Sequence, residues 1–186
     1  MRAALITLVV LLLPAALLAT PTMGVYFTWT PVQMTYSPTP YEEFTGYVYL
    51  QNTECYVTAA EFRIDPPAGI MLASFEIPPG SLNLGDPESG IAITYWPPLN
   101  GYYPGYNLLC TIGFVAMKWC VGGGGGGATL QDAPVIILPH PETGRISTTC
   151  WPENMIFDVN PMTSIICPSQ IGVHEKSWGA IKSLYE

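Results

Sequence analysis

The feature that most constrains the fold is a period-two alternation through residues 44–64. In the first half, F-T-G-Y-V-Y-L-Q, Val48 and Leu50 fall on one side of an extended chain. In the second half, V-T-A-A-E-F-R-I, the same holds for Ala60, Phe62 and Ile64. Such alternation is typical of strands with one buried and one wet face. The polar N-T-E between the halves predicts a short connection, so the stretch predicts two half-buried strands that need an opposing layer.

Residues 1–19 predict a cleaved secretory signal. Arg2 supplies a minimal positive end, residues 3–13 form a continuous apolar run, and Pro14 interrupts it before a second short apolar stretch. The run is shorter than the roughly 20 residues that a spanning helix needs. We therefore expect membrane contact only through this segment before cleavage, with an uncleaved anchor as the alternative.

The remaining chain, about 165 residues, is long enough for one domain with a core. It is acidic, since the sequence has 14 Asp and Glu against 6 Lys and Arg. This charge argues against nucleic acid, which needs a basic face, and against anionic lipid surfaces. The 18 Gly, 19 Pro and 11 Tyr indicate an all-β composition with Gly and Pro turns.

Further apolar or alternating runs bring the expected total to about nine strands. They are residues 24–29, 70–77, 90–96, 107–117, 134–138 and 145–149, with one or two short pieces within 151–168. In residues 90–96, Ile91, Ile93 and Tyr95 share one side. Residues 107–117 predict a central strand buried on both faces, and residues 82–89 and 97–106 predict loops. Together these runs predict an antiparallel β-sandwich over residues 24–168.

Six consecutive glycines occupy residues 122–127. A domain boundary is one interpretation of such a flexible run. We favour a loop within one domain, because too few residues follow to build a second core.

The order of segments resembles that of the cohesin and carbohydrate-binding β-sandwich domains. Their pattern includes a V-x-V-x-L strand, an x-G/A-x-E/A-F-x-I/L strand before a D-P turn, and a later L-x-x-I-x-F-x-A strand. The matching pieces are V-Y-L at 48–50, A-E-F-R-I-D at 60–65 and L-C-T-I-G-F-V-A at 109–116. The resemblance implies a cohesin-like or immunoglobulin-like fold. Cohesins bind dockerins, whose D-x-N-x-D calcium loops are absent here, so it implies at most the receptor half of such a pair.

All 5 cysteines follow the signal segment. In an oxidising compartment they predict disulfides, and no C-x-x-C spacing supports a zinc or thioredoxin-like site. We expect Cys120 to pair with Cys150, because each closes a predicted strand. Cys55 is then left with Cys110 or Cys167 as its partner.

No residue pattern predicts catalysis, a metal or a cofactor. His140 and His174 lack a metal-ligand spacing, and no nucleophile elbow, Walker loop or dinucleotide fingerprint occurs. The adjacent Glu42 and Glu43 point to opposite faces of a strand, so they cannot act jointly. Asp86 and Glu88 lie in one loop but provide too few oxygens for calcium. We expect a protein that is not an enzyme.

One aromatic stretch, residues 95–106, predicts a binding loop. It contains Tyr95, Trp96, Tyr102, Tyr103 and Tyr106. Flat rings with polar edges suit sugar rings or peptides. The alternative, which we favour, is that these rings and the prolines pack on one another and stiffen the loop.

Residues 169–186 predict a linker followed by an amphipathic tail. Trp178, Ile181 and Tyr185 fall at helical spacing, with Leu184 on the same side and Lys182 adding positive charge. The ending resembles the W-G-x-I/V-K-x-L-Y/F of uncharacterised small secreted bacterial proteins. A helix this short must dock to persist, either on its own sandwich or on a partner, and we favour a partner or an export handle.

These features predict a non-catalytic β-sandwich, secreted, periplasmic or at the cell surface, that acts as a structural or protein-interaction module. The alternative is a carbohydrate-binding module that uses the loop of residues 95–106. The expected partner is accordingly an extracellular protein or polysaccharide. A secreted hydrolase would require a convergent catalytic site that the sequence does not contain.

Overall fold

The two alternating segments form strands β3 (Glu43–Gln51) and β4 (Tyr56–Asp65), and these strands belong to opposite sheets. The computed structural model describes residues 20–53, 55–101, 105–120 and 129–168. Val48 and Leu50 of β3 and Phe62 and Ile64 of β4 are buried, as the alternation predicted. Tyr49 lies on the side of β3 expected to be wet but is fully buried too, next to a register shift between Val48 and Tyr49. The polar residues between the strands thus carry the chain from one layer to the other.

The first sheet has the strand order β14-β1-β3-β8-β5. Its members are β14 (Asn160–Pro161), β1 (Thr22–Tyr26), β3, β8 (Tyr106–Ala116) and β5 (Ile70–Glu76). Strand β8 follows the predicted run of residues 107–117 and lies between β3 and β5, so its position inside a sheet is confirmed. The predicted burial of both faces is wrong, because its outward residues, such as Thr111 and Val115, are only partly buried. All pairings along β1, β3, β8 and β5 are antiparallel.

The second sheet is organised around β4. On one side β4 pairs with β7 (Gly90–Leu99), which pairs with β6 (Leu82–Asp86). On the other side its first half pairs with β12 (Ser147–Trp151), followed by β13 (Met155–Asp158). Its second half pairs with β11 (Ala133–Leu138), followed by β15 (Ser164–Ile166) and β2 (Thr35–Tyr36). Strands β9 (Trp119–Cys120) and β10 (Thr129–Leu130) form a separate parallel pair.

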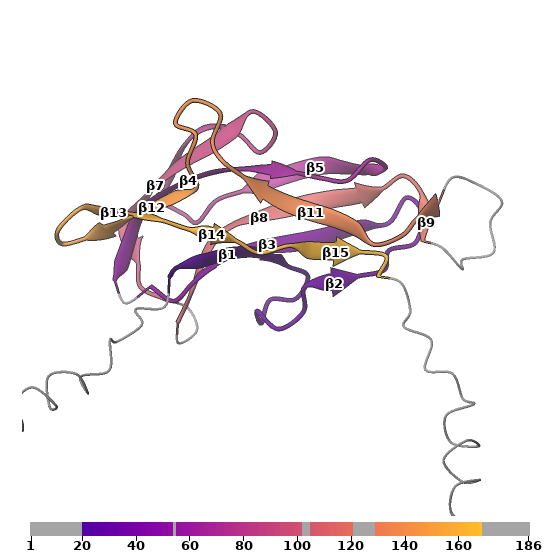
Figure 1. Ribbon diagram of the computed structural model, residues 1–186, viewed down its shortest axis with the longest axis horizontal. Coiled ribbons are helices and arrows are strands. Elements are labelled where there is room, and N and C mark those ends of the chain that lie inside the picture. The colour runs from indigo at the N-terminus through magenta and orange to yellow at the C-terminus, as the bar shows by residue number, and fades with distance from the viewer. Residues whose placement is uncertain (1–19, 54, 102–104, 121–128, 169–186) are drawn as a thin grey trace, which may run out of the picture.

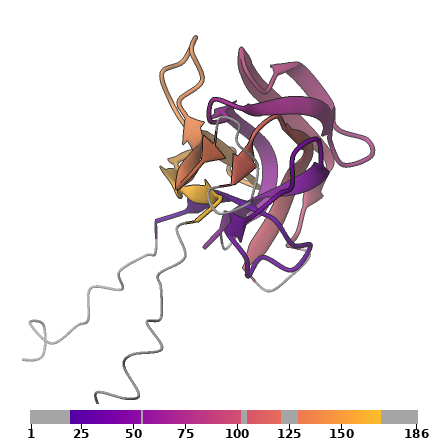
Figure 2. The same cartoon turned by 90° about the vertical axis from the view of Figure 1, so that its right-hand side faces the viewer.

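The core lies between the two sheets. Its largest fully buried side chains include Phe62 and Ile64 of β4, Ile91 and Ile93 of β7, and Leu109, Ile112 and Phe114 of β8. Figure 1 shows the strands running along the long axis of the sandwich, and Figure 2 looks from the end at which β9 lies. The described residues contain strands and no helix, so the fold is all-β.

Nine of the strands have five or more residues, and the rest are shorter bridging pieces. The prediction of a loop over residues 82–89 is wrong, because β6 forms there and pairs with β7 from Leu82↔Thr94 to Asp86↔Gly90. Strand β7 likewise continues into the predicted loop, as far as Leu99. The hairpin closes through Gly85 and Gly90, at φ of 112° and 125°, which residues other than glycine rarely adopt.

Candidate interaction surface

The side of the second sheet that faces away from the core is unusually apolar. We call it the β4 outer face and define it by residues of β6, β7, β4, β12 and β13 that cross-strand pairing places in rows. The first row contains Leu82, Thr94, Ala59, Thr149 and Ile156. Leu82 is 60% exposed and Ile156 58% exposed, so large apolar groups flank small residues at the middle of this row.

A second row lies beside the first and becomes charged toward β13. It contains Leu84, Ala92, Glu61, Ser147 and Asp158. The Ser147 hydroxyl donates to the Glu61 carboxylate at 2.7 Å, and Arg145 forms an ion pair with Asp158 at 2.7 Å. Leu84, at the β6 end, is 64% exposed. The face therefore has an apolar half and a polar border.

Aromatic rings occupy the end of the face where β4 begins. Tyr56 of β4 pairs in register with Trp151 of β12, and their rings meet edge to face with centroids 5.9 Å apart. Both residues are about half exposed. Trp96 of β7 is 77% exposed, and its alternation with Thr94 places it on the same side of the sheet. Aromatic rings held on strands are frequent energetic anchors of protein interfaces.

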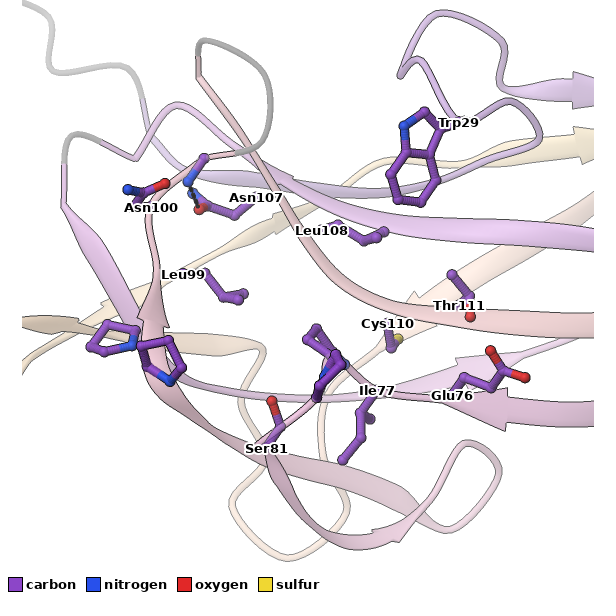
Figure 3. A pocket seen from close by; sticks show the side chains of 15 residues that line it. Trp29, Glu76, Ile77, Ser81, Leu99, Asn100, Asn107, Leu108, Cys110 and Thr111 are labelled. Atoms are coloured by element: carbon purple, nitrogen blue, oxygen red, sulfur yellow. Dashed lines mark hydrogen bonds between the residues drawn. The ribbon is translucent and has the colours of Figure 1, made fainter.

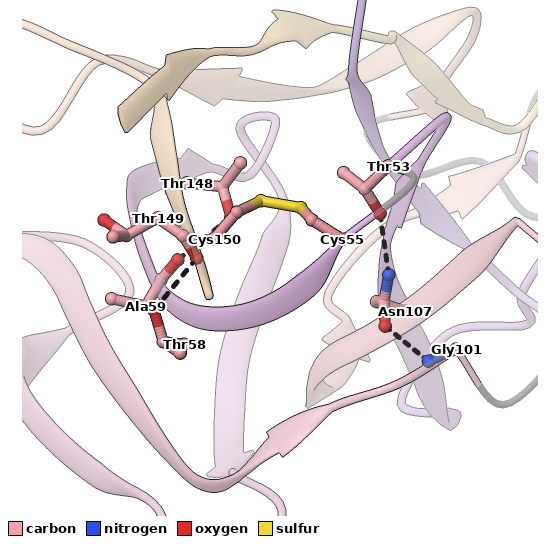
Figure 4. The surroundings of a disulfide bond; sticks show 9 residues. All are labelled: Thr53, Cys55, Thr58, Ala59, Gly101, Asn107, Thr148, Thr149 and Cys150. Carbon is pink, nitrogen blue, oxygen red and sulfur yellow. Dashed lines mark hydrogen bonds between the residues drawn. A yellow bond between two sulfur atoms is a disulfide. The ribbon is translucent and has the colours of Figure 1, made fainter. Parts of the chain in front are cut away.

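A disulfide fixes the backbone beside this aromatic pair, as Figure 4 shows. Cys55 and Cys150 are bonded, with their Cα atoms 5.6 Å apart, and they directly neighbour Tyr56 and Trp151. The Thr58 hydroxyl donates to the Thr149 carbonyl at 3.1 Å, and the Thr148 hydroxyl donates to the Ala59 carbonyl at 3.0 Å. Side-chain bonds thus add to the ladder between β4 and β12, and the rings project from a rigid base.

The predicted Cys120–Cys150 disulfide is wrong. The register of β12 against β4 brings Cys150 opposite Val57, next to Cys55. Cys120 lies past the far end of β8 and pairs with Cys167, with Cα atoms 5.2 Å apart. Cys110, one of the partners considered for Cys55, is a free thiol in the core. Burial raises the pKa of the Cys110 thiol well above its usual value, which disfavours the reactive thiolate.

The aromatic stretch of residues 95–106 does not form one platform. Tyr95 is buried between the sheets, where its hydroxyl donates to the Leu109 carbonyl at 3.2 Å and burial raises the pKa of its phenol. Tyr106 is half-buried, and its ring packs edge to face on Tyr26 and Tyr49. The prediction failed because adjacent strand residues point to opposite faces, so Tyr95 and Trp96 cannot share a surface. Tyr102 and Tyr103 lie outside the described residues.

The remaining candidate groups do not converge on a reactive site. His140 is buried in the turn after β11, and its carbonyl accepts the Gly144 amide. Glu42 accepts hydrogen bonds from the Tyr36 hydroxyl and from Thr39, which lower the pKa of its carboxyl group. Asp86 accepts the amides of Glu88 and Ser89 within the β6–β7 turn, and the Ser89 hydroxyl and amide lower the pKa of its carboxyl group. Within the described ranges, no group of three His, Cys, Asp or Glu could hold a metal ion.

Several predicted segments lie outside the described residues. They are the signal segment, the glycine run, His174 and the tail with Trp178, Ile181, Lys182, Leu184 and Tyr185. Among the residues that the structure does describe, no helix is long and apolar enough to cross a membrane.

No protein-family model and no curated protein sequence matches the chain. Solved cohesin structures match its fold. A chain of the CaDoc0917–CaCohA2 complex is 14% identical, with a TM-score of 0.52 over 79% of this chain and 98% of that chain. The third ScaB cohesin of R. flavefaciens, in complex with a group 1 dockerin, is 9% identical, with a TM-score of 0.52 over 82% and 98%. The sixth cohesin of scaffoldin B from Acetivibrio cellulolyticus, in complex with a mutant Cel5 dockerin, is 11% identical, with a TM-score of 0.51 over 79% and 97%. The fold is therefore a cohesin-like β-sandwich.

Proposed function

We propose that this cohesin-like sandwich is a non-catalytic protein-interaction module, secreted or at the cell surface, that binds a protein partner through the β4 outer face. The observation that carries the proposal is the exposure of Leu82, Leu84 and Ile156 on one side of one sheet. Strand residues that face water are normally polar, and contiguous exposed apolar area marks interaction sites.

The construction of the face supports binding rather than catalysis. Its apolar and aromatic side chains project from paired strands, so little conformational freedom remains to be lost on binding. Glu61, Ser147 and Asp158 form a polar border beside the apolar half, and protein interfaces usually combine apolar area with polar groups at the edge.

The extracellular setting rests on one structural observation and on one prediction from the sequence. Two disulfides, Cys55–Cys150 and Cys120–Cys167, are formed in the fold, and such bonds persist in oxidising compartments. The predicted signal over residues 1–19 agrees with export. The cohesins with a similar fold were solved with dockerins, which favours a protein as the partner of this chain.

A polysaccharide is the second candidate ligand. The observation that favours it is the exposure of three aromatic rings at one end of the face, Trp96, Trp151 and Tyr56. Stacked sugar rings would use these aromatic residues and leave Leu84 and Ile156 free. Quenching of tryptophan fluorescence by insoluble or soluble glycans, lost in Trp151→Ala but unchanged in Leu84→Glu, would favour this ligand over a protein.

The tail and the domain boundaries complete the proposal. The sandwich, predicted over residues 24–168, extends to Thr22, where β1 begins, and the residues from Trp178 to Tyr185 act as a recognition or export signal separate from the face. Deleting residues 177–186 should then impair export or localisation while leaving the melting temperature of the secreted protein unchanged. A truncated protein that is exported normally but melts well below the parent would show a structural tail instead.

Cross-linking in the producing cells tests the protein-binding role. The parent chain is compared with Leu84→Glu on the β4 outer face and with Met71→Glu, which lies on the first sheet and is 53% exposed. We expect one set of cross-linked proteins in the parent and in Met71→Glu, and its loss in Leu84→Glu. The same cross-links in all three proteins would show that the β4 outer face does not bind the partner.

A further inference from the structure

A second surface of the molecule has the form of an incomplete sheet. Strand β8 pairs with β3 along its whole length, from Gln51↔Tyr106 to Glu43↔Val115. Strand β5 covers the other side of β8 only from Glu76↔Thr111 to Ile70↔Ala116. Within the described part of the chain, residues 106–110 therefore have a strand neighbour on one side only.

A groove of about 780 Å³ lies against this uncovered edge. Leu108 projects into it from β8, Ile77 from the chain after β5, and Leu99 from the end of β7, as Figure 3 shows. Its walls include two proline pairs, Pro78 with Pro79 and Pro97 with Pro98. Proline has no amide hydrogen, so neither wall can complete a hydrogen-bond ladder with β8, and the groove stays open.

Hydrogen bonds fix the shape of the groove at the start of β8. The Asn107 side chain accepts the Gly101 amide at 2.7 Å and donates to the Thr53 hydroxyl at 2.8 Å. On the inner side, the Leu109 carbonyl accepts the Tyr95 hydroxyl. The wall that carries Leu99 is thus fixed relative to β8, and a strand can enter without remodelling the loop.

We propose that the groove accepts residues 170–176 of a second copy of this chain as an added β-strand on the free edge of β8. The segment reads Q-I-G-V-H-E-K, and Ile171 and Val173 alternate with polar or small residues. An added strand gains main-chain hydrogen bonds along an open edge and places alternate side chains in the adjoining pocket. Ile171 and Val173 are the apolar side chains that would meet Leu108.

The reach of the chain excludes its own tail as the donor. Cys167 is bonded to Cys120, which lies four residues beyond the Ala116 end of β8. Leu108, which Ile171 and Val173 would meet, lies about 27 Å back from Ala116 along the strand, at about 3.4 Å per residue. Val173 follows Cys167 by six residues, which span at most about 22 Å when fully extended. Ile171 and Val173 therefore cannot meet Leu108 of their own chain, and in this pairing they fill the groove of another copy.

The charge of the groove selects an orientation. Glu76 is exposed at the Thr111 end of the free edge, on a chain of formal net charge −8. A strand parallel to β8 places Lys176 beside Glu76, whereas an antiparallel strand places it at the opposite end. Exposed ion pairs add little affinity but bias the orientation of docking. Because donor and acceptor surfaces differ, repetition of the contact gives open head-to-tail chains.

Sedimentation velocity of the full secreted chain, from micromolar to several hundred micromolar, tests the proposal. The parent should form chains as its concentration rises. Val173→Asp in the tail and Leu108→Glu in the groove should each raise the dissociation constant by at least about tenfold, because a charge would be buried. The matched controls, Leu184→Asp in the later tail and Leu82→Glu on the β4 outer face, should assemble as the parent does. Loss of assembly in Leu82→Glu alone would assign it to the β4 outer face and overturn this inference while leaving the proposed function intact.

Two further measurements decide the case if Leu108→Glu does not fold. A synthetic peptide of residues 169–186 should inhibit assembly of the parent, and the same peptide with Val173→Asp should not. Glu76→Lys should weaken assembly, and Lys176→Glu added to it should restore assembly. If the parent is monomeric at every concentration, the proposal is wrong. The prolines beside β8 would then serve to prevent strand pairing at this edge.

Discussion

The two sheets present outer faces that differ sharply although their strands alternate in the same way. On the first sheet, register places Glu43, Val115 and Met71 in one row, Thr45, Gly113 and Ser74 in the next, and Tyr47, Thr111 and Glu76 in a third. On the β4 outer face, the corresponding positions include Leu82, Leu84 and Ile156. Both outer faces point away from the same core, so the burial needed for folding does not explain the difference between them.

Alternation therefore predicts which side of a strand is buried, but it does not predict the role of the exposed side. Most outward residues of the first sheet are polar or small and suit contact with water, with Met71, Val115 and Tyr47 as the exceptions. The leucines and isoleucine of the second suit contact with another surface. Substitutions on the two sheets should therefore have different effects on stability and on binding.

The largest effect should come from the disulfide beside the aromatic pair. Replacing Cys55 and Cys150 by Ser releases a link between residues 95 apart, which the chain-entropy model values at about 4–5 kcal/mol of unfolding free energy. It should also weaken partner binding, since Tyr56 and Trp151 lose their fixed base. Replacing Cys120 and Cys167, 47 residues apart, should cost about 4 kcal/mol and leave binding unchanged. Denaturant unfolding and a binding assay measure both, and equal loss of binding in the two variants would contradict the contrast.

The next effect should fall on binding alone. Leu84→Glu should lower the affinity for the partner by at least about tenfold, as expected when a charge replaces a large apolar side chain that is buried on binding, while the unfolding free energy changes by no more than about 0.5 kcal/mol. Met71→Glu, at a position that is also more than half exposed but lies on the first sheet, should change neither quantity. Titration calorimetry with the partner that cross-linking identifies provides the affinities. If Met71→Glu weakens binding as much as Leu84→Glu, the contrast between the faces does not hold.

A smaller effect should separate Tyr95 from Trp96. Tyr95→Phe removes the hydroxyl that satisfies the buried Leu109 carbonyl and should destabilise the fold by about 1–2 kcal/mol without affecting binding. Trp96→Ala should leave stability within about 0.5 kcal/mol and reduce affinity. Thermal unfolding distinguishes them. Comparable loss of stability in Trp96→Ala would place its ring in the packing of the sandwich rather than on the face.

The smallest effect should come from the charged border. The Arg145–Asp158 pair is exposed, so Arg145→Ala should cost less than about 1 kcal/mol of stability. If the border steers the partner, the variant should slow association and reduce the dependence of the association rate on salt. Stopped-flow kinetics at two salt concentrations measures this rate. An unchanged rate and salt dependence would restrict the interface to the apolar half.

The sequence predicted the core well because burial imposes a period that short-range patterns record. Val48, Leu50, Phe62 and Ile64 are inside as their alternation indicated, and the resemblance to cohesins correctly anticipated the sandwich. Strand β6 was missed because its inward positions hold Asn83 and Gly85 while its leucines face outward, which inverts the usual pattern. The L-N-L alternation of residues 82–84 was the available signal.

The disulfides and the candidate surface depended on information that local patterns do not contain. Cys150 meets Cys55 only because β12 pairs with β4 in one particular register. The β4 outer face likewise joins residues from five strands, of which Leu82 and Ile156 are far apart in the chain. Adjacent aromatic residues gave a misleading cluster, since Tyr95 and Trp96 diverge to opposite sides of β7.

Covalent footprinting of the protein bound to its partner, compared with the purified monomer, tests whether the β4 outer face is the binding surface. Hydroxyl radicals label exposed side chains, and mass spectrometry reports the labelling of each residue. If the β4 outer face binds the partner, labelling of Leu84, Trp151 and Ile156 should fall several-fold in the complex, as expected for residues in a desolvated interface, while Met71 stays unchanged. Protection of Met71 with continued labelling of Leu84 and Ile156 would contradict the account.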